Sequence, residues 1–291
     1  MKEEKIELRQ HLHAQGLTPK EYGRLLKNGK VYYFQVPTCD AKRLVLPSQV
    51  VIRERGPRLQ VGRDPVLVHK DKGFVVVYKP SGYLSVRAAH RHKDPTIMGF
   101  VYRLCGEAHA VHRLDEDTSG LMLVATTVEC QLRLKSAIEK RTVKRNYLAL
   151  VSGHIHEKRR LYSKLVRNRG DGKRGSVTNP NQDFKEAVTH IRPLQKLRGA
   201  CLIEAQLETG RTHQIRIQLS EFKHPVLGDS LYSPIAVQKK SNRLALHAHT
   251  LSFHHPYENK ECSFEAPLAD DLEKLRRTLL FKEKGKHNKK H

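Results

Sequence analysis

Hydrophobic and polar positions near the N-terminus are spaced as in two short amphipathic helices. Leu8 and Leu12 form one apolar stripe. The run Thr18-Pro19-Lys20-Glu21 then has the form of a capping box with proline at the first helical position. The predicted elements of this small module, which spans residues 1–60, are two helices within 6–30 and short strands at 31–36 and 50–52.

A longer region of strand-like and helix-like segments follows a polar stretch. Residues 53–65 contain Gly56-Pro57 and Asp64-Pro65 and predict a linker. From Val66 onward the segments continue for about two hundred residues, long enough for one sizeable core. The predicted elements are strands at 75–78, 121–125 and 147–151, helices at 129–140 and 268–279, an exposed basic loop at 156–183 with a possible short strand, and a basic tail at 282–291. We therefore expect one large domain at residues 66–281.

A polar loop at residues 112–118 carries the most informative chemistry in the chain. Arg113 and Asp115 precede a predicted turn at 118–120, which leads directly into the apolar strand. A loop that is anchored by core and displays a guanidinium and a carboxylate is a common form of active site. Asp115 and Asp117 also fit a simple Asx turn. They faintly resemble the paired aspartates of magnesium-dependent aspartyl-phosphate phosphatases, although in those enzymes the strand precedes the pair.

A second candidate segment is Leu207-Glu-Thr-Gly-Arg-Thr-His-Gln-Ile-Arg216. We expect Gly210 and Thr212 to form a turn and a helix N-cap, although the alternation at 213–219 also fits a strand. A carboxylate that acts as a nucleophile has to stay ionised and oriented. A bidentate arginine supplies both conditions. We name Arg216 as the counter-ion of Asp115, with Arg211 as the alternative.

Composition points to a polyanionic partner. The 291 residues include 54 Lys and Arg against 30 Asp and Glu, a formal net charge of +24. Nucleic acid is the usual partner of so basic a chain. Aromatic residues make up only 6% of the chain and tryptophan is absent, which argues against a broad base-stacking surface. A single extruded nucleotide would need just one well-placed ring.

Cysteine and histidine usage narrows the class further. The five cysteines form no C-x-x-C pair, which argues against a disulfide framework and for a reducing, cytoplasmic compartment. No apolar stretch predicts a membrane span or a signal peptide. Of the 18 histidines, four gather at 247, 249, 254 and 255. We interpret these four as strand and turn residues near a polyanion-binding surface, with metal binding as the lesser alternative.

Together these residues closely resemble the RluA-like pseudouridine synthases, which isomerise uridine to pseudouridine in ribosomal or transfer RNA. The similarity runs from about Val66 to Leu280, and its motifs are weak singly and strong in this order. They are Lys79-Pro80-Ser81-Gly82, His112-Arg113-Leu114-Asp115 with Thr118-Ser119-Gly120, Arg145-Asn146-Tyr147, Thr209 to Arg216, His224-Pro225 with Gly228-Asp229, and Leu246-His247-Ala248.

The resemblance implies a role for each site residue. Asp115 would be the catalytic carboxylate, with Arg216 as its partner. From its local sequence alone, Tyr147 is typical of a core strand residue. The resemblance implies that it would stack on the base or deprotonate it. The residues expected to bind substrate are Arg113, which would hold the uridine out of the helix, together with His112, Arg211 and Lys79.

The resemblance also implies the architecture and the partners. The expected fold is α+β, the pseudouridine synthase fold, with a mixed, mostly antiparallel bent sheet flanked by helices. Here it would be preceded by a small RNA-binding module like the alpha-L motif of ribosomal proteins. We expect no metal, no cofactor and a monomer that acts on ribosomal RNA in preference to transfer RNA. The alternative is a non-catalytic RNA-binding ribosome assembly factor, which should have lost Asp115 or Arg216.

Overall fold

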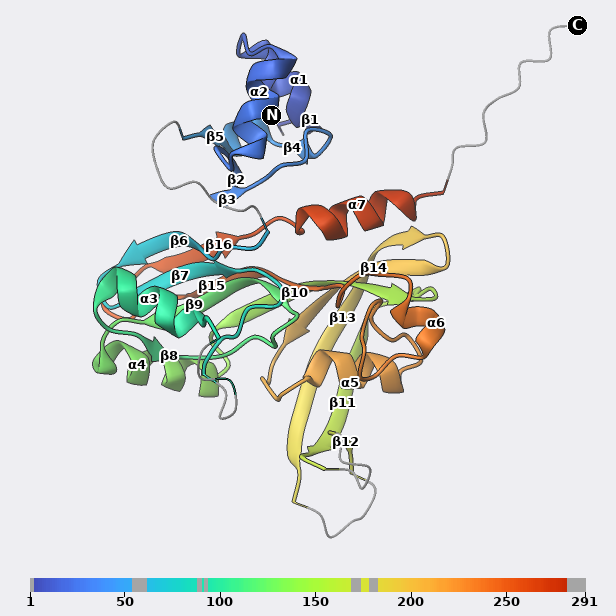
Figure 1. Cartoon of the computed structure of the whole chain (residues 1–291). Coiled ribbons are helices and arrows are strands. Elements are labelled where there is room, and N and C mark those ends of the chain that lie inside the picture. The colour runs from blue at the N-terminus through green and yellow to red at the C-terminus, as the bar shows by residue number, and fades with distance from the viewer. Residues whose placement is uncertain are drawn as a thin grey trace, which may run out of the picture.

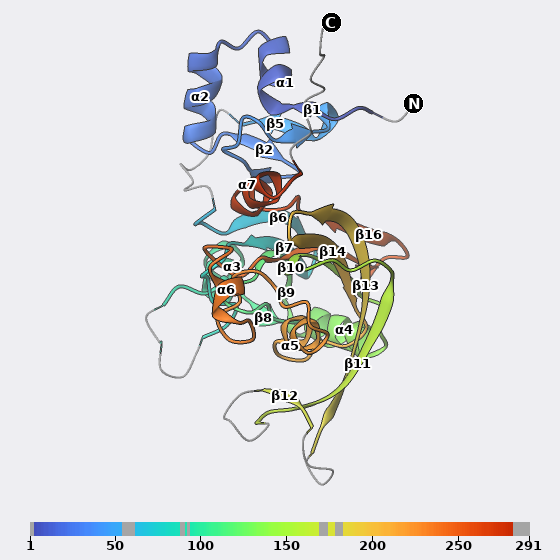
Figure 2. The same ribbon diagram turned by 90° about the vertical axis from the view of Figure 1, so that its right-hand side faces the viewer.

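The computed structural model describes residues 3–53, 62–87, 91, 94–168, 174–177 and 183–281. A small N-terminal module lies above a larger α+β domain, and helix α7 (Asp270–Thr278) lies between them (Figures 1 and 2). Most of the predicted linker, much of the predicted basic loop and the predicted tail lie outside the described residues.

The N-terminal module has the two predicted helices and the predicted strand at 50–52, whereas residues 31–37 form two short paired strands in place of one. Its helices are α1 (Leu8–Ala14) and α2 (Pro19–Lys27), and its strands are β1 (Ile6–Glu7), β2 (Val31–Tyr33), β3 (Val36–Pro37), β4 (Leu44–Val45) and β5 (Val50–Ile52), with a 3-10 turn η1 at Pro47–Gln49. The capping box forms, because the Glu21 amide donates to the Thr18 hydroxyl and the Thr18 amide donates to the Glu21 carboxylate. The module has an apolar cluster of its own around Leu8, Leu12 and Leu26.

The large domain is built on an 11-stranded sheet. Its strands run in the order β12 (Gly175–Ser176), β11 (Arg159–Val166), β13 (Lys185–Leu197), β14 (Ala200–Leu207), β10 (Lys144–Ser152), β15 (Leu246–His254), β9 (Ser119–Ala125), β7 (Phe74–Lys79) and β6 (Val66–Asp71), with β16 (Glu261–Glu265) beside β15 and β8 (His109–Ala110) beside β9. The β9–β15 pair is parallel, and the other pairs among the described strands are antiparallel. The expected mixed, mostly antiparallel sheet is confirmed.

Helices cover both faces of this sheet and bury β9 completely. Met122 and Val124 belong to the apolar cluster that α3 (Ile97–Cys105) joins. Leu121 and Leu123 belong to the cluster that α4 (Val128–Glu139) joins. Because successive strand residues point to opposite faces, the unbroken apolar run that the sequence shows is what a strand covered on both sides requires.

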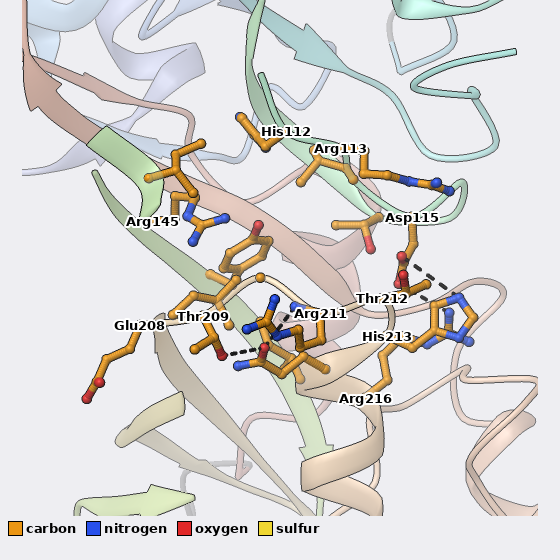
Figure 3. A pocket seen from close by; sticks show the side chains of 18 of the residues that line it. His112, Arg113, Asp115, Arg145, Glu208, Thr209, Arg211, Thr212, His213 and Arg216 are labelled. Carbon is orange, nitrogen blue, oxygen red and sulfur yellow. Dashed lines mark hydrogen bonds and ion pairs between the residues drawn. The ribbon is translucent and has the colours of Figure 1, made fainter. Parts of the chain in front are cut away.

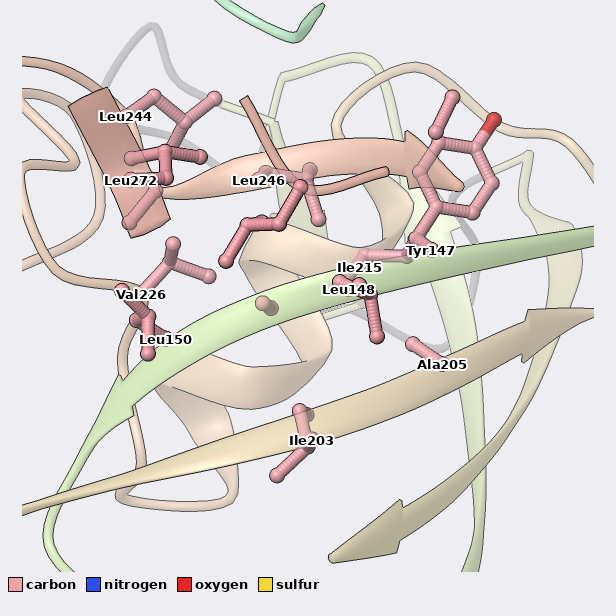
Figure 4. Close-up of a cluster of buried hydrophobic side chains, with 14 of the residues drawn as sticks. Tyr147, Leu148, Leu150, Ile203, Ala205, Ile215, Val226, Leu244, Leu246 and Leu272 are labelled. Atoms are coloured by element: carbon pink, nitrogen blue, oxygen red, sulfur yellow. The ribbon is translucent and has the colours of Figure 1, made fainter. Parts of the chain in front are cut away.

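The remaining helices lie on the other half of the domain. They are α5 (Gln214–Glu221) and α6 (Ile235–Gln238) (Figure 1). Ile215 and Leu219 of α5 and Leu272 of α7 pack into one cluster with β10 and β14, part of which Figure 4 shows. The helical interpretation of residues 213–219 is therefore the right one.

Three local predictions were wrong. The segment 156–183, predicted as an exposed loop with a possible short strand, contains the eight-residue strand β11, which pairs with β13. Its exposed residues alternate with less exposed ones over only part of its length, so hydrophobic periodicity does not reveal it. Ser119 and Gly120 belong to β9 rather than to a turn. His213 is the N-cap of α5 in place of Thr212.

Candidate active site

A cavity of about 420 Å³ opens where the loop before β9, the strand β10 and the segment before α5 meet. Its volume is in the usual range for small-ligand sites. Tyr147, Ile215 and Leu246 give it an apolar side that continues into the hydrophobic core (Figure 4). Five arginines line it, of which Arg113, Arg145, Arg211 and Arg216 are labelled in Figure 3 and Arg141 is the other.

The loop that carries Asp115 is fastened at both ends. The Ser85 hydroxyl donates to the Leu114 carbonyl over 2.7 Å and accepts the Leu114 amide over 3.0 Å. After the loop, Gly120 has φ 115° and lies so close to β15 that a Cβ there would be 2.2 Å from the Ala248 carbonyl oxygen. Only glycine permits this approach, which places the loop at the parallel junction of β9 and β15.

Lys79 fastens the same loop from inside. Its side chain is fully buried, and its ammonium donates to the carbonyls of Pro80, Tyr83 and Glu116. Burial lowers the pKa of Lys79 to about 7, and the neighbouring acidic groups, Asp117 first, oppose that shift. Lys79 does not line the cavity. Its expected contact with substrate is therefore wrong, since its three donors already bind backbone carbonyls.

Arg216 joins two carboxylates. Its Nε and Nη2 donate to the two oxygens of Asp229, each over 2.8 Å, and its Nη1 lies 3.4 Å from Oδ2 of Asp115. Burial opposes the ionisation of Asp229, but the hydrogen bond from Arg216 holds the Asp229 pKa below its ordinary value. The bidentate clamp thus belongs to Asp229, and Asp115 receives the remaining donor. Arg216, rather than Arg211, is the arginine that reaches Asp115.

His213 completes the surroundings of Asp115. Its Nε2 lies 3.9 Å from Oδ1 of Asp115 (Figure 3). Its Nδ1 shares a 2.9 Å hydrogen bond with the Tyr232 hydroxyl. Its backbone is left-handed, with φ 60°. Such a conformation costs about 1–3 kcal/mol in a non-glycine residue, and strain of this kind gathers at functional sites. Burial lowers the pKa of His213, so its imidazole is neutral at pH 7.

Tyr147 and His112 line the cavity as neutral groups. Burial raises the pKa of Tyr147 above its ordinary value, so the phenol keeps its proton at neutral pH. Burial lowers the pKa of His112 to about 3. The His112 Nε2 accepts the Leu123 amide of β9 over 3.0 Å, which leaves its proton on Nδ1. His112 therefore holds the strand as well as lining the cavity.

Two other arginines named from the sequence also border the cavity. Arg113 is exposed. Arg211 donates through Nε to the Glu186 carbonyl over 3.0 Å, and it also lines an adjoining pocket beside β11 and β13. Asp229 and His213 were not assigned roles from the sequence, although both stand inside quoted motifs. The motifs contained both residues, but the contact of Asp229 with Arg216 and that of His213 with Asp115 depend on the fold.

The four clustered histidines lie in β15 or directly after it, as predicted, but His247 and His255 are buried and do not contribute to a surface. His247 is completely buried and shares a 2.8 Å hydrogen bond with Ser119. His255 lies near Asp71 and Glu258, a set with ligand types suited to a metal. The His255 Nδ1, however, accepts the backbone amides of residues 257 and 258, so its proton stays on Nε2. A nitrogen that carries a proton has no lone pair for a metal. We therefore do not assign a metal site to Asp71, His255 and Glu258.

No helix of the described residues is long and apolar enough to cross a membrane.

Residues 73–221 match the family model of RNA pseudouridylate synthases. Ribosomal large subunit pseudouridine synthase D of Neisseria meningitidis serogroup A is 34% identical over 268 residues, covering 85% of this chain and 71% of the relative. The protein of the same name from Vibrio cholerae is 36% identical over 241 residues, with 77% and 72% covered.

A solved structure supports the same fold. Human RNA Pseudouridylate Synthase Domain Containing 1 superposes with a TM-score of 0.59 at 23% identity, over 78% of this chain and 97% of that one. The fold and the family match agree. The loop that carries Asp115 leads into β9 where that strand pairs in parallel with β15, and this region lies inside the matched residues. With this similarity in sequence and fold, the chain belongs to the RluA-like family of RNA pseudouridine synthases.

Proposed function

We propose that Asp115 is the catalytic carboxylate that isomerises uridine to pseudouridine in the RNA of the large ribosomal subunit. The observation that carries the proposal is the position of Asp115, at the cavity and 3.4 Å from an arginine that Asp229 clamps. A carboxylate held by a fixed guanidinium stays ionised and oriented, as a nucleophile or a base must be. A non-catalytic assembly factor would have no need of this arrangement.

The reaction needs no atoms beyond those of the substrate. The bond between ribose C1′ and uracil N1 breaks, the base turns in the cavity, and C1′ joins C5 of the base. The C5 proton then leaves and N1 gains one, so that product and substrate are isomers. Asp115 supplies the ionised group, and Tyr147 offers the ring on which the base stacks. Because the Tyr147 pKa is raised, we assign it stacking in preference to proton removal.

RNA is held by the basic surface around the cavity. Arg160, Tyr162 and Lys164 are exposed and alternate with less exposed residues along β11, and the Arg160 guanidinium lies 5.8 Å from the Tyr162 ring centre. Lys164 lies 4.5 Å from the ring centre of Phe184. Cations beside exposed aromatic rings suit phosphates and unstacked bases together. This strand adjoins the cavity through residues 210–212, which line both pockets.

Ribosomal RNA is favoured over transfer RNA because both curated relatives described above are named for the large ribosomal subunit. We propose that the protein acts as a monomer in the cytoplasm, where all five of its cysteines remain free thiols. The N-terminal module, residues 1–60, is proposed to bind RNA through its basic second helix, which carries Lys20, Arg24 and Lys27.

Mapping pseudouridine in large-subunit RNA tests the proposal. RNA from cells that lack this protein should be missing pseudouridine at one or a few positions, and the wild-type gene should restore it. The Asp115→Asn variant should not. The purified enzyme should stay active in EDTA. Full restoration by Asp115→Asn would remove Asp115 from the chemistry, and an unchanged pseudouridine map would refute the ribosomal assignment.

A further inference from the structure

Arg145 is a buried arginine with no partner. It is 6% exposed, lines the cavity, and makes no hydrogen bond or ion pair with the residues that the structure describes. Its Nε is sealed from solvent and lacks an acceptor. A buried guanidinium without a counter-charge costs considerable free energy, so a residue in this state is retained for something other than stability.

The chain makes room for this guanidinium. Gly210 packs against it so closely that a Cβ at Gly210 would lie 2.8 Å from Nη1 and 3.5 Å from Nη2 of Arg145. Strand β10 and the segment before α5 therefore hold the guanidinium between them, at the other end of the cavity from Asp115 (Figure 3). Because the Arg145 guanidinium is held from both sides, it is already in place before a ligand binds.

The acceptor for Arg145 has to come from a ligand. Of the other carboxylates that line the cavity, Glu139 is exposed to solvent, and Glu208 is engaged by Arg141 over 3.0 Å and by His190. Asp115 is held by Arg216. The Nδ1 proton of His112 and the hydroxyl of Thr118, which line the same cavity, are also buried without a partner among the described residues. This wall of the cavity thus presents donors and positive charge, which suits an oxygen that carries negative charge.

The uracil base fits this position better than a phosphate does. Tyr147 lines the cavity two residues along the same strand from Arg145, and both Arg145 and Asp115 act electrostatically on its phenol. A base stacked on Tyr147, with its ribose at Asp115, extends toward Arg145. RNA phosphates stay near solvent, where the exposed Arg113 borders the cavity.

We propose that Arg145 binds a carbonyl oxygen of uracil and stabilises the negative charge that the base gains when its glycosidic bond breaks. This inference rests on the proposed function. When the bond between C1′ and N1 breaks, its electron pair stays on the base and spreads to the carbonyl oxygens. A fixed guanidinium that is itself buried stabilises that charge more than it stabilises neutral uracil. Arg145 thereby lowers the barrier more than it tightens the binding of the ground state.

The test compares Arg145→Gln with the wild-type enzyme on large-subunit RNA from cells that lack this protein. Under single turnover at saturating enzyme, the rate constant should fall about 10²- to 10³-fold, the range for loss of one charge-stabilising donor. The dissociation constant for RNA and its salt dependence should stay within about twofold. The melting temperature should hold or rise, because a buried unpaired charge is gone. Arg145→Lys should recover part of the rate.

Arg133→Gln is the matched control, since Arg133 is an exposed arginine of α4 that pairs with Glu129 over 2.7 Å. It should change neither rate nor affinity. A lower melting temperature with the rate intact would make Arg145 structural and overturn the inference. Weaker RNA binding with a shallower salt slope would make it a phosphate contact and overturn it too. An inactive wild-type enzyme would refute the proposed function itself, whereas equal turnover by wild type and Arg145→Gln would refute only the inference.

Discussion

At the scale of residues, the two carboxylates on Arg216 should differ sharply in what they contribute. The Asp229 side chain is 1% exposed and accepts both strong hydrogen bonds, whereas that of Asp115 is 19% exposed and accepts one long one. Asp229→Asn leaves the guanidinium without its main counter-charge and should cost about 3–5 kcal/mol of unfolding free energy. Asp115→Asn should cost about 1 kcal/mol or less. Urea denaturation of both variants measures the difference, and equal losses would contradict this division of roles.

The hydroxyl of Tyr147 can be separated from its ring. Tyr147→Phe keeps the stacking surface and removes the only titratable atom of the side chain. If stacking dominates, the single-turnover rate should fall less than about tenfold, because the raised pKa makes the phenol a poor base. Tyr147→Ala should lose far more. Complete loss of activity in Tyr147→Phe would assign proton transfer to the hydroxyl instead.

We expect His213 to make the rate of the reaction fall at acidic pH, as an acidic limb of the pH–rate profile. Burial holds its pKa below the ordinary 6.5, although Asp115 opposes the shift, so the imidazole gains its proton only in acidic solution. Once protonated it competes for Asp115, 3.9 Å away, and the single-turnover rate should fall. Because the unfolded chain binds the proton more readily, folding stability should also decline as pH falls from 6.5 toward the lowered pKa.

The control for His213 is His213→Asn, since asparagine also tolerates a left-handed backbone. This variant should lack the limb below pH 6.5 while its rate at pH 8 stays close to that of the wild type. A pH–rate profile with the same acidic limb in both proteins would assign that limb to another group.

At the scale of elements, β11 should act through its charge. The double variant Arg160→Gln with Lys164→Gln should weaken RNA binding and reduce the slope of log affinity against log salt by about two units, one for each lost phosphate contact. Lys70→Gln with Lys72→Gln is the matched control, because both lysines are exposed and lie at β6 and the β6–β7 turn, at the opposite end of the sheet order. Equal slopes for the two double variants would remove β11 from the RNA-binding surface.

At the scale of the whole molecule, the N-terminal module is fixed to the large domain by charge. Arg43 donates to Asp270 of α7 over 2.8 Å, and the Cys39 amide donates to the same carboxylate over 2.8 Å. Arg277 of α7 binds Asp40 in return. With Arg43 and Asp40 buried, these contacts hold the module above one side of the sheet, away from β11 and β12 (Figure 2).

Deleting residues 1–60 should weaken RNA binding and flatten its salt dependence, because Lys20, Arg24 and Lys27 of α2 are proposed to contact RNA phosphates. The rate at saturating RNA should largely survive, because Asp115, Tyr147 and Arg216 are untouched. Filter binding at several salt concentrations, with single-turnover rates beside it, makes both measurements. An unchanged slope with full activity would show that the module is a packing element and that its proposed RNA binding is wrong.

Sequence by itself determined the class of the protein and singled out the loop that carries Asp115. The apolar run at 121–125 fits a strand buried on both faces and anchors the polar loop before it, so the pattern made Arg113 and Asp115 candidates. The catalytic role of Asp115 came from the resemblance to the family and stays a prediction. Capping of α2 and the acidic start of α7 were likewise predictable, because these signals involve residues within a turn of one another.

Only the tertiary structure decided which charged groups meet. Asp229 lies 13 residues from Arg216 and Asp115 lies 101 away, and no spacing rule tells which of them takes the bidentate clamp. Lys79 and Arg145 are both basic residues in quoted motifs, yet one is satisfied by three carbonyls and the other by none. Hydrophobic patterning fixes which residues are buried, whereas the partners of a buried charge depend on how distant strands and loops come together.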